Sequence, residues 1–467
     1  MKRYIIISAI AAIFAACAMG PNYRRPIVSA PNVFRGGTDI PTTDARSIGD
    51  LKWFEFFKDD QLRQLIGIAL EENYDLREAV ARVSAARANL GITRADQFPT
   101  VTATTNITNL RSSSSGSIPL PPAVNPDRTF GSVFLNLLSF EVDVWGRLRR
   151  TTEAARANLL ATEENRKAVV TTLVSDTATA YLSLLELDTE LEIANRTLST
   201  RQESLRLIQV REQGGIATEL DVRQGEQLVY SASQTIPDIE RQIEETENRL
   251  NVILARSPRA ITRGRSLIQQ EELPSVPPGL PSSLLERRPD IRAAEQNLIA
   301  SNAIIGAARV AYFPQISLTA LTGFQSNQLS SLFAGATRYW QFVPQVTQPI
   351  FNAGRIRSNE RLLEAQRQIA LVQYERVIQT AFREVSDALV DYRKLKEIRI
   401  QQELLVTTLR DRSRLAYLRY QGGVDTLLNA LDADRDLFNA ELSLTQTRRN
   451  EVVSIVQLYK ALGGGWQ

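Results

Sequence analysis

Few residues in this chain could carry chemistry of their own. The 467 residues include no His, one Cys and 52 Asp and Glu. Without His, no side chain has an ordinary pKa suited to acid–base catalysis near neutral pH. One Cys allows neither an intrachain disulfide nor a Cys/His set for zinc or an iron–sulfur cluster. No motif gathers the acids into a catalytic pair, so neither an enzyme nor a bound cofactor or metal is expected.

A dense group of charges follows the Gly422-Gly423 pair: Asp425, Asp432, Asp434, Arg435 and Asp436. Acids that are held close together repel one another and attract cations. A solvated helix face is the simpler interpretation, because Asp432 and Arg435 have the spacing of an i,i+3 ion pair. The overall charge is close to zero, with 55 Lys and Arg against 52 acids, so nothing favours nucleic-acid binding.

The N-terminus predicts export from the cytoplasm. Two basic residues precede a short apolar run, Ile5–Ala16, so residues 1–16 are interpreted as a signal peptide. Phe14-Ala15-Ala16-Cys17 resembles a bacterial lipobox, in which the Cys becomes the acylated N-terminus. Several acyl chains on Cys17 would anchor the protein stably. A buried N-terminal helix is the alternative interpretation.

The chain repeats one plan. Short motifs recur at fixed spacings: Gln97-Phe98-Pro99 with Tyr312-Phe313-Pro314 (215 positions), Gly146-Arg147 with Gly354-Arg355 and Gln213-Gly214-Gly215 with Gln421-Gly422-Gly423 (both 208). A longer Ser- and Pro-rich loop in the first copy, Arg111 to Arg128, accounts for the difference. A repeat of this length indicates a duplicated structural unit.

Both copies are predicted to have the same order of elements. Each begins with a helix, 59–94 or 282–309, which ends at a Phe-Pro pair. Strand-like segments rich in Val, Ile, Thr and Phe follow at 100–110, 130–144, 315–325 and 339–351. In the second strand, several even-numbered residues are apolar, which predicts one apolar face: Phe134, Leu138, Phe140, Val142 and Val144. Pro344 and Pro349 either argue against the last strand or place it at a seam.

Aromatic residues near the strand ends suggest a membrane girdle: Trp145, Tyr339 and Trp340. Packing against the helices is the alternative for Trp145. Trp53 and Phe54 are expected to pack in a helix bundle.

Very long helices follow the strands. Arg147 to Glu212 contains no Pro or Gly and would reach about 100 Å as one helix. The two Gly-Gly pairs then end the long helices, and a second helix of roughly forty residues follows each. Such lengths indicate coiled-coil packing rather than a compact enzyme.

Four strands cannot close a barrel by themselves. Open strand edges are not tolerated in lipid, and the smallest bacterial barrels have about eight strands. An exported chain with four amphipathic strands must therefore share its barrel with other copies.

The sequence resembles the outer-membrane factor family, the TolC/OprM-type efflux channels, and specifically its lipoprotein branch. Cys17 through Pro26, Trp53 to Ile66 and Tyr420 through Ala433 carry the resemblance, which covers essentially the whole mature chain. It implies an α+β membrane protein: a trimeric twelve-stranded outer-membrane β-barrel, with four strands per chain, continued by a long periplasmic α-helical barrel in two tandem structural repeats. It also implies a passive conduit that works with a periplasmic adaptor and an inner-membrane pump.

The resemblance assigns roles to the helix ends. Leu428 and Asp432 match the pair that narrows the periplasmic entrance, with Arg435 one turn further on, and Asp425 stands where some relatives carry a locking Arg. The tips at Gly214-Gly215 and Gly422-Gly423 are assigned to adaptor contact. For the first tip, a plain helix–turn–helix corner is an equal alternative.

The expected layout has four parts: signal peptide 1–16, lipidated segment 17–58, first repeat 59–270 and second repeat 271–467. The first repeat contains the strand pair 100–144 and hairpin 147–256, and the second contains the strand pair 315–351 and hairpin 354–462. The expected function is small-molecule efflux of drugs or other amphiphiles through the outer membrane. The alternatives are a protein-secretion duct and a coiled-coil lipoprotein without a pore.

Overall fold

The computed structural model describes residues 19–28, 34–35, 47–113, 121, 125–269 and 283–466. The predicted signal peptide, Cys17 and most of the loop between Arg111 and Arg128 lie outside these residues. The chain forms two compact units. One comprises Met1–Ile27, Val83–Ala161 and Ala294–Tyr374, and the other comprises Val28–Arg82, Thr162–Ala293 and Glu375–Gln467.

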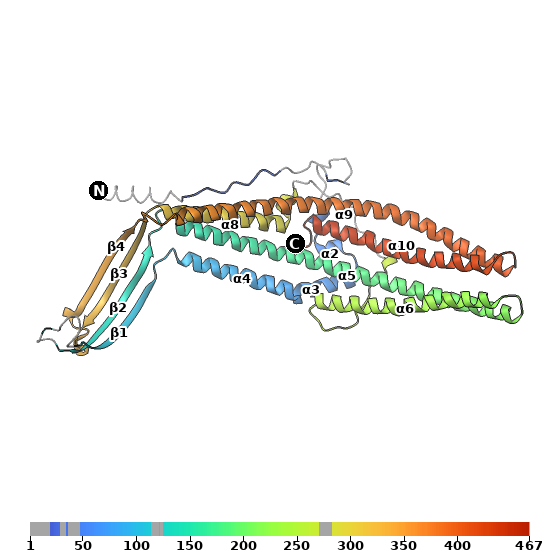
Figure 1. Cartoon of the computed structure of the whole chain (residues 1–467), viewed down its shortest axis with the longest axis horizontal. Coiled ribbons are helices and arrows are strands. Elements are labelled where there is room, and N and C mark those ends of the chain that lie inside the picture. The colour runs from blue at the N-terminus through green and yellow to red at the C-terminus, as the bar shows by residue number, and fades with distance from the viewer. Residues whose placement is uncertain are drawn as a thin grey trace. The chain divides into compact units, whose positions relative to one another are not determined.

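The first unit contains an antiparallel sheet of four strands in the order β1-β2-β3-β4 (Figure 1). The strands are β1 (Val101–Arg111), β2 (Asp127–Glu141), β3 (Gln315–Ser326) and β4 (Arg338–Thr347). All four predicted strands are present, but two of them end earlier than predicted. The carboxylate of Asp143 accepts from the backbone N–H of Leu148 and Arg149, both at 3.0 Å, so the chain after Glu141 turns into a helix. After Thr347, Pro349 has no N–H to continue a ladder.

The alternation predicted for the second strand is wrong beyond Leu137. Leu137 pairs with Ala320 but Phe140 pairs with Leu318, so β2 carries an extra residue there. Such a bulge reverses the parity of the side chains that follow. The apolar residues Leu138 and Phe140 therefore do not continue one simple face.

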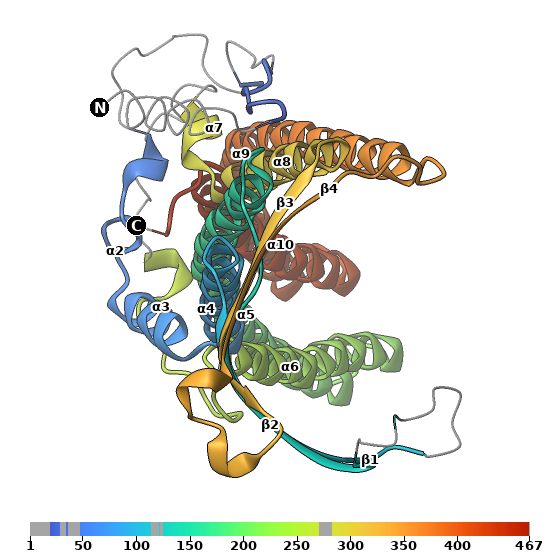
Figure 2. The ribbon, with the colours of Figure 1, turned by 90° about the vertical axis from the view of Figure 1, so that its left-hand side faces the viewer.

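The two outer strands of the sheet have one unpaired edge each. The sheet is curved (Figure 2), and every residue of β4 is exposed. Large apolar side chains remain in solvent on these strands, with Ile107 60% exposed, Trp340 76% and Val346 66%. Pro344 lies in β4, where an edge strand tolerates the missing donor. The free edges of β1 and β4 therefore need partner strands from another chain.

The long helices match the prediction closely. Helices α5 (Arg147–Gln213) and α9 (Arg355–Gln421) have 67 residues each, and α6 (Glu219–Ile253) and α10 (Leu427–Ala461) have 35 each. One 18-residue window of α5 has a mean hydropathy of 1.3, but 61% of that window is buried, as in a core helix. The equal lengths follow from the duplication seen in the sequence.

The two shorter predicted helices are each divided in two. The first consists of α3 (Asp60–Glu72) and α4 (Tyr74–Ala95), and the second consists of α7 (Leu284–Arg287) and α8 (Pro289–Arg309). Asn73 makes the first break, because its side chain accepts from Leu76 N–H at 3.0 Å and donates to Ile253 O at 2.9 Å. Arg288 makes the second, since it precedes a proline. The remaining short helical elements are α2 (Trp53–Phe56), η1 (Ile48–Asp50), η2 (Leu267–Gln269), η4 (Val310–Tyr312), η5 (Leu329–Ser331) and η6 (Gly335–Thr337).

The second unit has an aromatic core around the C-terminal helix. Phe56 stacks on Tyr459 at 4.3 Å between ring centroids, and Phe57 contacts the same tyrosine edge-on at 6.5 Å. Phe54 is 44% exposed, so the prediction that it packs in the bundle is wrong. Within the short helix α2, Phe56 rather than Phe54 is buried, because Phe56 lies on the face that packs against Tyr459.

Candidate functional site: the helical hairpin tips

Both helical hairpins turn at a glycine with a positive φ. Gly215 has φ 71° and Gly423 has φ 72°, a region that favours glycine. In the second tip, Val424 N–H donates to Arg419 O at 3.0 Å and closes the turn. In the first, Thr218 and Asp221 cap each other's backbone N–H at the start of α6. The predicted Gly-Gly stops are thus confirmed as tight turns.

Asp425 accepts three hydrogen bonds within the second tip, just before Thr426, the N-cap residue of α10. Its carboxylate accepts from the Asn429 amide at 2.7 Å, from Thr426 N–H at 2.8 Å and from Arg419 Nε at 3.0 Å. These donors, the Asn429 amide foremost and then the Arg419 guanidinium, hold the pKa of Asp425 below its usual value. Asp425 therefore stays charged and engaged within its own chain.

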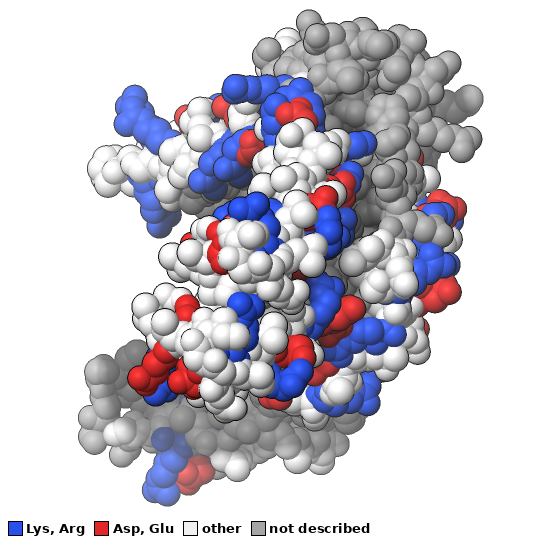
Figure 3. All heavy atoms as spheres, turned by 90° about the vertical axis from the view of Figure 1, so that its right-hand side faces the viewer, with Lys and Arg blue, Asp and Glu red and all other residues white. Residues whose placement is uncertain are grey.

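Asp432 is paired within its own chain as well. Arg435 lies 3.1 Å from Asp432 and 3.3 Å from Asp436, and Arg412 lies 2.8 Å from Asp436. This is the i,i+3 pairing that the surface interpretation anticipated. Leu428 is 51% exposed, so its side chain remains available for a contact outside the chain. Over the surface that Figure 3 shows, basic and acidic side chains are interspersed, without a field of one sign.

Asp434, for which the sequence predicted no role, is the buried member of this acidic group. Its carboxylate lies 2.7 Å from Arg201 Nε, and the two side chains are 9% and 3% exposed. Arg201 also donates to Leu228 O at 3.0 Å and lies over the Phe438 ring at 5.1 Å. Burial raises the pKa of Asp434. Helical spacing could have shown this, because Leu431, Asp434 and Phe438 share one face of α10.

Further ion pairs hold α10 between its neighbours. Along the helix, carboxylates and guanidinium groups from α5 and α9 meet those of α10: Arg196–Glu441 (2.6 Å), Arg410–Glu441 (2.7 Å), Arg449–Glu186 (2.7 Å), Arg399–Glu451 (2.5 Å) and Arg448–Glu403 (2.9 Å). Any displacement of α10 against α5 or α9 has to exchange several of these charge-assisted bonds.

Both tips expose apolar side chains beside their glycines. Ile216 is 72% exposed and Leu220 65% at the first tip, and Val424 is 66% exposed at the second. The hairpins also contact each other, since Arg211 lies 4.6 Å from the Tyr420 ring centroid and donates to Tyr420 O at 3.4 Å. Within the described residues, no cluster of His, Cys, Asp and Glu is suited to hold a metal.

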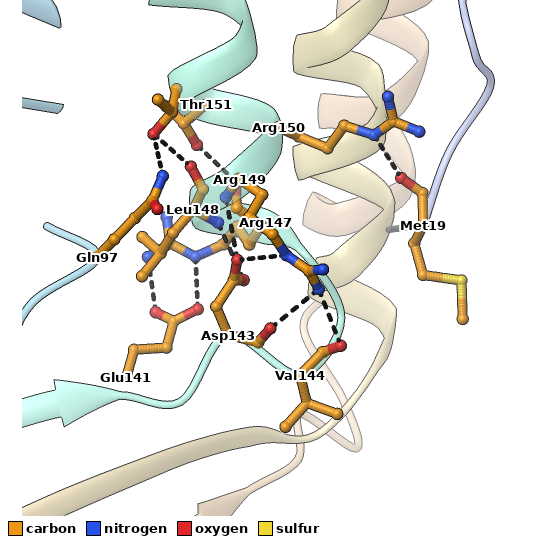
Figure 4. A network of polar contacts seen from close by, with 11 residues as sticks. Met19, Gln97, Glu141, Asp143, Val144, Arg147, Leu148, Arg149, Arg150 and Thr151 are labelled. Atoms are coloured by element: carbon orange, nitrogen blue, oxygen red, sulfur yellow. Dashed lines mark hydrogen bonds and ion pairs between the residues drawn. The ribbon is translucent and has the colours of Figure 1, made fainter. Parts of the chain in front are cut away.

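The segment that follows Cys17 is bound to the first unit. Arg150, 5% exposed, donates to Met19 O at 3.1 Å, to Gly20 O at 3.3 Å and to the Asn22 side chain at 2.8 Å. Figure 4 shows Arg150 reaching Met19, beside the paired Arg147–Glu141 and Arg149–Asp143 at the start of α5.

Trp145 and Trp340, two of the three residues predicted for a membrane girdle, differ in their exposure to solvent. Trp145 donates from its indole to Pro314 O at 2.8 Å and packs on Phe313 at 4.9 Å. It is therefore half-buried within the chain, against the segment that precedes β3 rather than against a long helix. Trp340 remains 76% exposed on β4, as a girdle residue would be in a single chain.

An exported chain with an unclosed four-stranded sheet and long helical hairpins is a subunit of an outer-membrane channel. The sequence profile of the outer membrane efflux protein family matches residues 65–256 and 280–464, so the chain belongs to this family. The family consists of channels rather than enzymes, and its members are outer-membrane channels of tripartite efflux systems.

Individual relatives cover nearly the whole chain. It is 37% identical over 474 residues to the toluene efflux pump outer membrane protein TtgC of Pseudomonas putida, covering 100% of this chain and 96% of that protein. It is 38% identical over 460 residues to the outer membrane protein OprJ of Pseudomonas aeruginosa, covering 98% and 95%.

Solved structures share the fold. The open-state MtrE outer membrane channel of Neisseria gonorrhoeae is 32% identical, with a TM-score of 0.86 and coverage of 97% of this chain and 99% of that chain. A membrane protein from Pseudomonas aeruginosa is 36% identical, with a TM-score of 0.88 and coverage of 96% and 100%. The resemblance seen in the sequence is confirmed, and a coiled-coil lipoprotein without a pore is excluded.

Proposed function

We propose that three copies of this chain form a passive conduit that carries small apolar or amphipathic molecules from a periplasmic adaptor and an inner-membrane pump to the cell exterior. The unpaired, exposed edges of the four-stranded sheet carry this proposal. The substrate class is supported by relatives of this chain, which include toluene, solvent and antibiotic efflux pump proteins.

Three copies suit the sheet for a geometric reason. Two copies would give eight strands, and an eight-stranded barrel has an interior that side chains fill. Three copies give twelve strands and leave room for a lumen. Pairing of β4 with β1 of the next copy closes the barrel and removes every edge from lipid.

The N-terminal processing and the repeat layout belong to the same proposal. The signal peptide 1–16 is removed, Cys17 carries the lipid anchor, and segment 17–58 leads to the repeats 59–270 and 271–467. The binding of Met19 and Gly20 by Arg150 supports this layout, because it holds the chain close to the acylated residue. The glycine tips at Gly214-Gly215 and Gly422-Gly423 contact the adaptor through their exposed apolar neighbours.

The entrance constriction is assigned to Leu428 and Asp432, with Arg435 and Asp425 modulating their charge. In a trimer, three Asp432 carboxylates would surround the axis and favour cations. Their pairing with Arg435 weakens that field. Asp432→Ala is expected to lower the cation preference of single channels in planar bilayers. Asp436→Ala is the matched control, because it also removes an acid paired with Arg435. Unchanged selectivity in Asp432→Ala would contradict the gate assignment.

Accumulation of a hydrophobic dye or of toluene in cells that lack this chain tests the function. We expect accumulation in the deletion strain and clearance on complementation. Unchanged accumulation, together with a changed set of exported proteins, would instead favour protein secretion.

A further inference from the structure

The two repeats agree at the level of single contacts. In the first, Gln97 donates to the Thr152 hydroxyl at 2.6 Å, and in the second Tyr312 donates to Glu360 at 3.0 Å. Gln97 and Tyr312 are 215 positions apart, and Thr152 and Glu360 are 208 apart, which are the spacings of the sequence repeat. A contact in one repeat can therefore be used to locate its equivalent in the other.

Where the first strand pair meets the second inside the chain, side chains close the junction between the sheet and the helices. The end of the first strand pair supplies Trp145, whose ring packs on Phe313 and whose indole N–H donates to Pro314 O. Gln315, at the start of β3, donates to Glu141 at 2.8 Å. These residues form the internal seam, in which an aromatic contact lies beside a polar one.

The equivalent seam at the other side of each repeat is open in one chain. Its two halves are the segment after the second strand pair, with Ile350 and Phe351, and the segment before the first strand pair, with Phe98. Ile350 is 91% exposed, Phe351 89% and Phe98 62%. By contrast Phe313, the equivalent of Phe98, is half-buried by Trp145.

The open seam also differs from the internal seam in its residue types. By the 208 spacing, Pro349 and Phe351 replace the Glu141 and Asp143 of the internal seam. In the first repeat those two acids neutralise Arg147 and Arg149. The second repeat thus replaces two carboxylates by apolar side chains that a single chain leaves in solvent.

We propose that Phe98 of one copy packs against Ile350 and Phe351 of the next copy, at the junction between the sheet and the helices. This inference rests on the closed barrel proposed above. Antiparallel pairing of β4 with β1 of the next copy brings the end of β4 at Thr347 beside the start of β1 at Val101. The residues just outside those ends then lie at one junction. The equivalent of Trp145 there is Ala353, so Ile350 and Phe351 are the large apolar side chains that this side of the open seam offers to Phe98.

A second copy is the occupant because the patch continues a sheet edge. An apolar patch that faced lipid would leave the neighbouring backbone edge unpaired in the membrane, which lipid does not tolerate. The partner half, Phe98 with Val101 at 64% exposure, is apolar as well, so each copy carries both complementary halves.

Disulfide trapping tests the seam. Phe98→Cys and Phe351→Cys are introduced together in a Cys17→Ser background, where the two new thiols are the only ones. The control pair combines Phe98→Cys with Phe333→Cys, which replaces a 69% exposed aromatic outside the seam. We expect oxidation of the purified protein to give linked dimers and trimers from the seam pair alone. The seam pair in the native Cys17 background shows whether loss of the anchor affects the result.

The outcomes separate the seam from the function on which it rests. A trimer by mass that stays uncrosslinked, or crosslinks equally in the control pair, would overturn the seam and leave the conduit standing. A monomer in every variant would overturn both. As a second measurement, Phe351→Ser is expected to lower the temperature at which the oligomer dissociates on SDS gels, whereas Phe333→Ser leaves that temperature unchanged. Equal shifts in the two variants would also overturn the seam.

Discussion

The aspartates near the second tip have different roles because their surroundings differ. Asp425 accepts hydrogen bonds within the turn, Asp432 and Asp436 share Arg435 at the surface, and Asp434 is buried against Arg201. Exposed pairs of this kind contribute little to stability, since water and salt screen them. A buried pair is different, because loss of one partner leaves the other charge without compensation.

Asp434→Ala is therefore expected to destabilise the folded protein by about 3–5 kcal/mol, because Arg201 stays buried and unpaired. Asp436→Ala, at a 36% exposed side chain, is the matched control and should cost less than about 1 kcal/mol. Thermal unfolding followed by circular dichroism measures both. Equal losses in the two variants would contradict the assigned role of burial.

Glu190 offers a test of pH dependence. Burial raises its pKa, and its hydrogen-bond partner is the Gln446 amide at 3.0 Å rather than a cation. An acid whose pKa is raised on folding binds its proton more tightly in the folded state, so stability falls as pH rises from its ordinary value through the raised one. Glu190→Gln removes that loss. We expect a higher melting temperature at pH 7, by about 1–3 °C, and no difference near pH 4; a pH-independent difference would refute the explanation.

At the scale of elements, the hairpins depend on their turns and on the pairing of α10. The backbone at Gly423 needs a positive φ, whereas Gly422 has an ordinary one. The ion pairs from α5 and α9 then fix the position of α10 on both sides. Any rearrangement of the second tip would have to start from these two features, because they set where Leu428 and Asp432 lie.

Gly423→Ala should destabilise the second tip by about 1 kcal/mol, because a Cβ strains a left-handed conformation. Gly422→Ala is the control, since its added Cβ would approach Leu418 O at no less than 3.4 Å. Hydrogen exchange of the tip amides measures the difference as faster exchange in Gly423→Ala. If the two variants exchange at the same rate, the turn conformation is not what stabilises the tip.

At the scale of the whole molecule, the sheet of each chain is one part of a shared barrel. A defect in one strand is therefore repeated in every copy. Gly323, in the central strand β3, has no room for a side chain, because an added Cβ would lie 2.0 Å from Val133 O and 2.8 Å from Phe134 Cα.

Gly323→Val is expected to abolish the oligomer band on unheated SDS gels and the insertion into membranes. Gly335→Val is the matched control, because nothing lies within 4 Å of an added Cβ there. Normal oligomers of Gly323→Val would show that the sheet register is not required for assembly.

Much of the architecture follows from the sequence alone. The Gly-free run after Gly146 determined the 67-residue helix α5, and the glycine pairs determined the turns, because helix continuity and its interruption are local properties. The duplication predicted the equal second half, α9 and α10. Four strands are too few to close a barrel, so the sequence predicted that other copies are needed. The reason is general: backbone N–H and C=O groups at a sheet edge cannot stay unpaired in lipid.

Other features were decided only by the tertiary structure. The bulge after Leu137 ended the predicted alternation, because strand register depends on the partner strand. The partner of Asp434 was decided by tertiary packing, because Arg201 belongs to α5, whereas the pairing of Asp432 with Arg435 follows from spacing within α10. Packing likewise placed Trp145 against Phe313 and left Phe98 exposed, although both phenylalanines precede a proline in the same motif. The sequence determined the periodic elements, and long-range packing determined which side chains those elements leave for a partner.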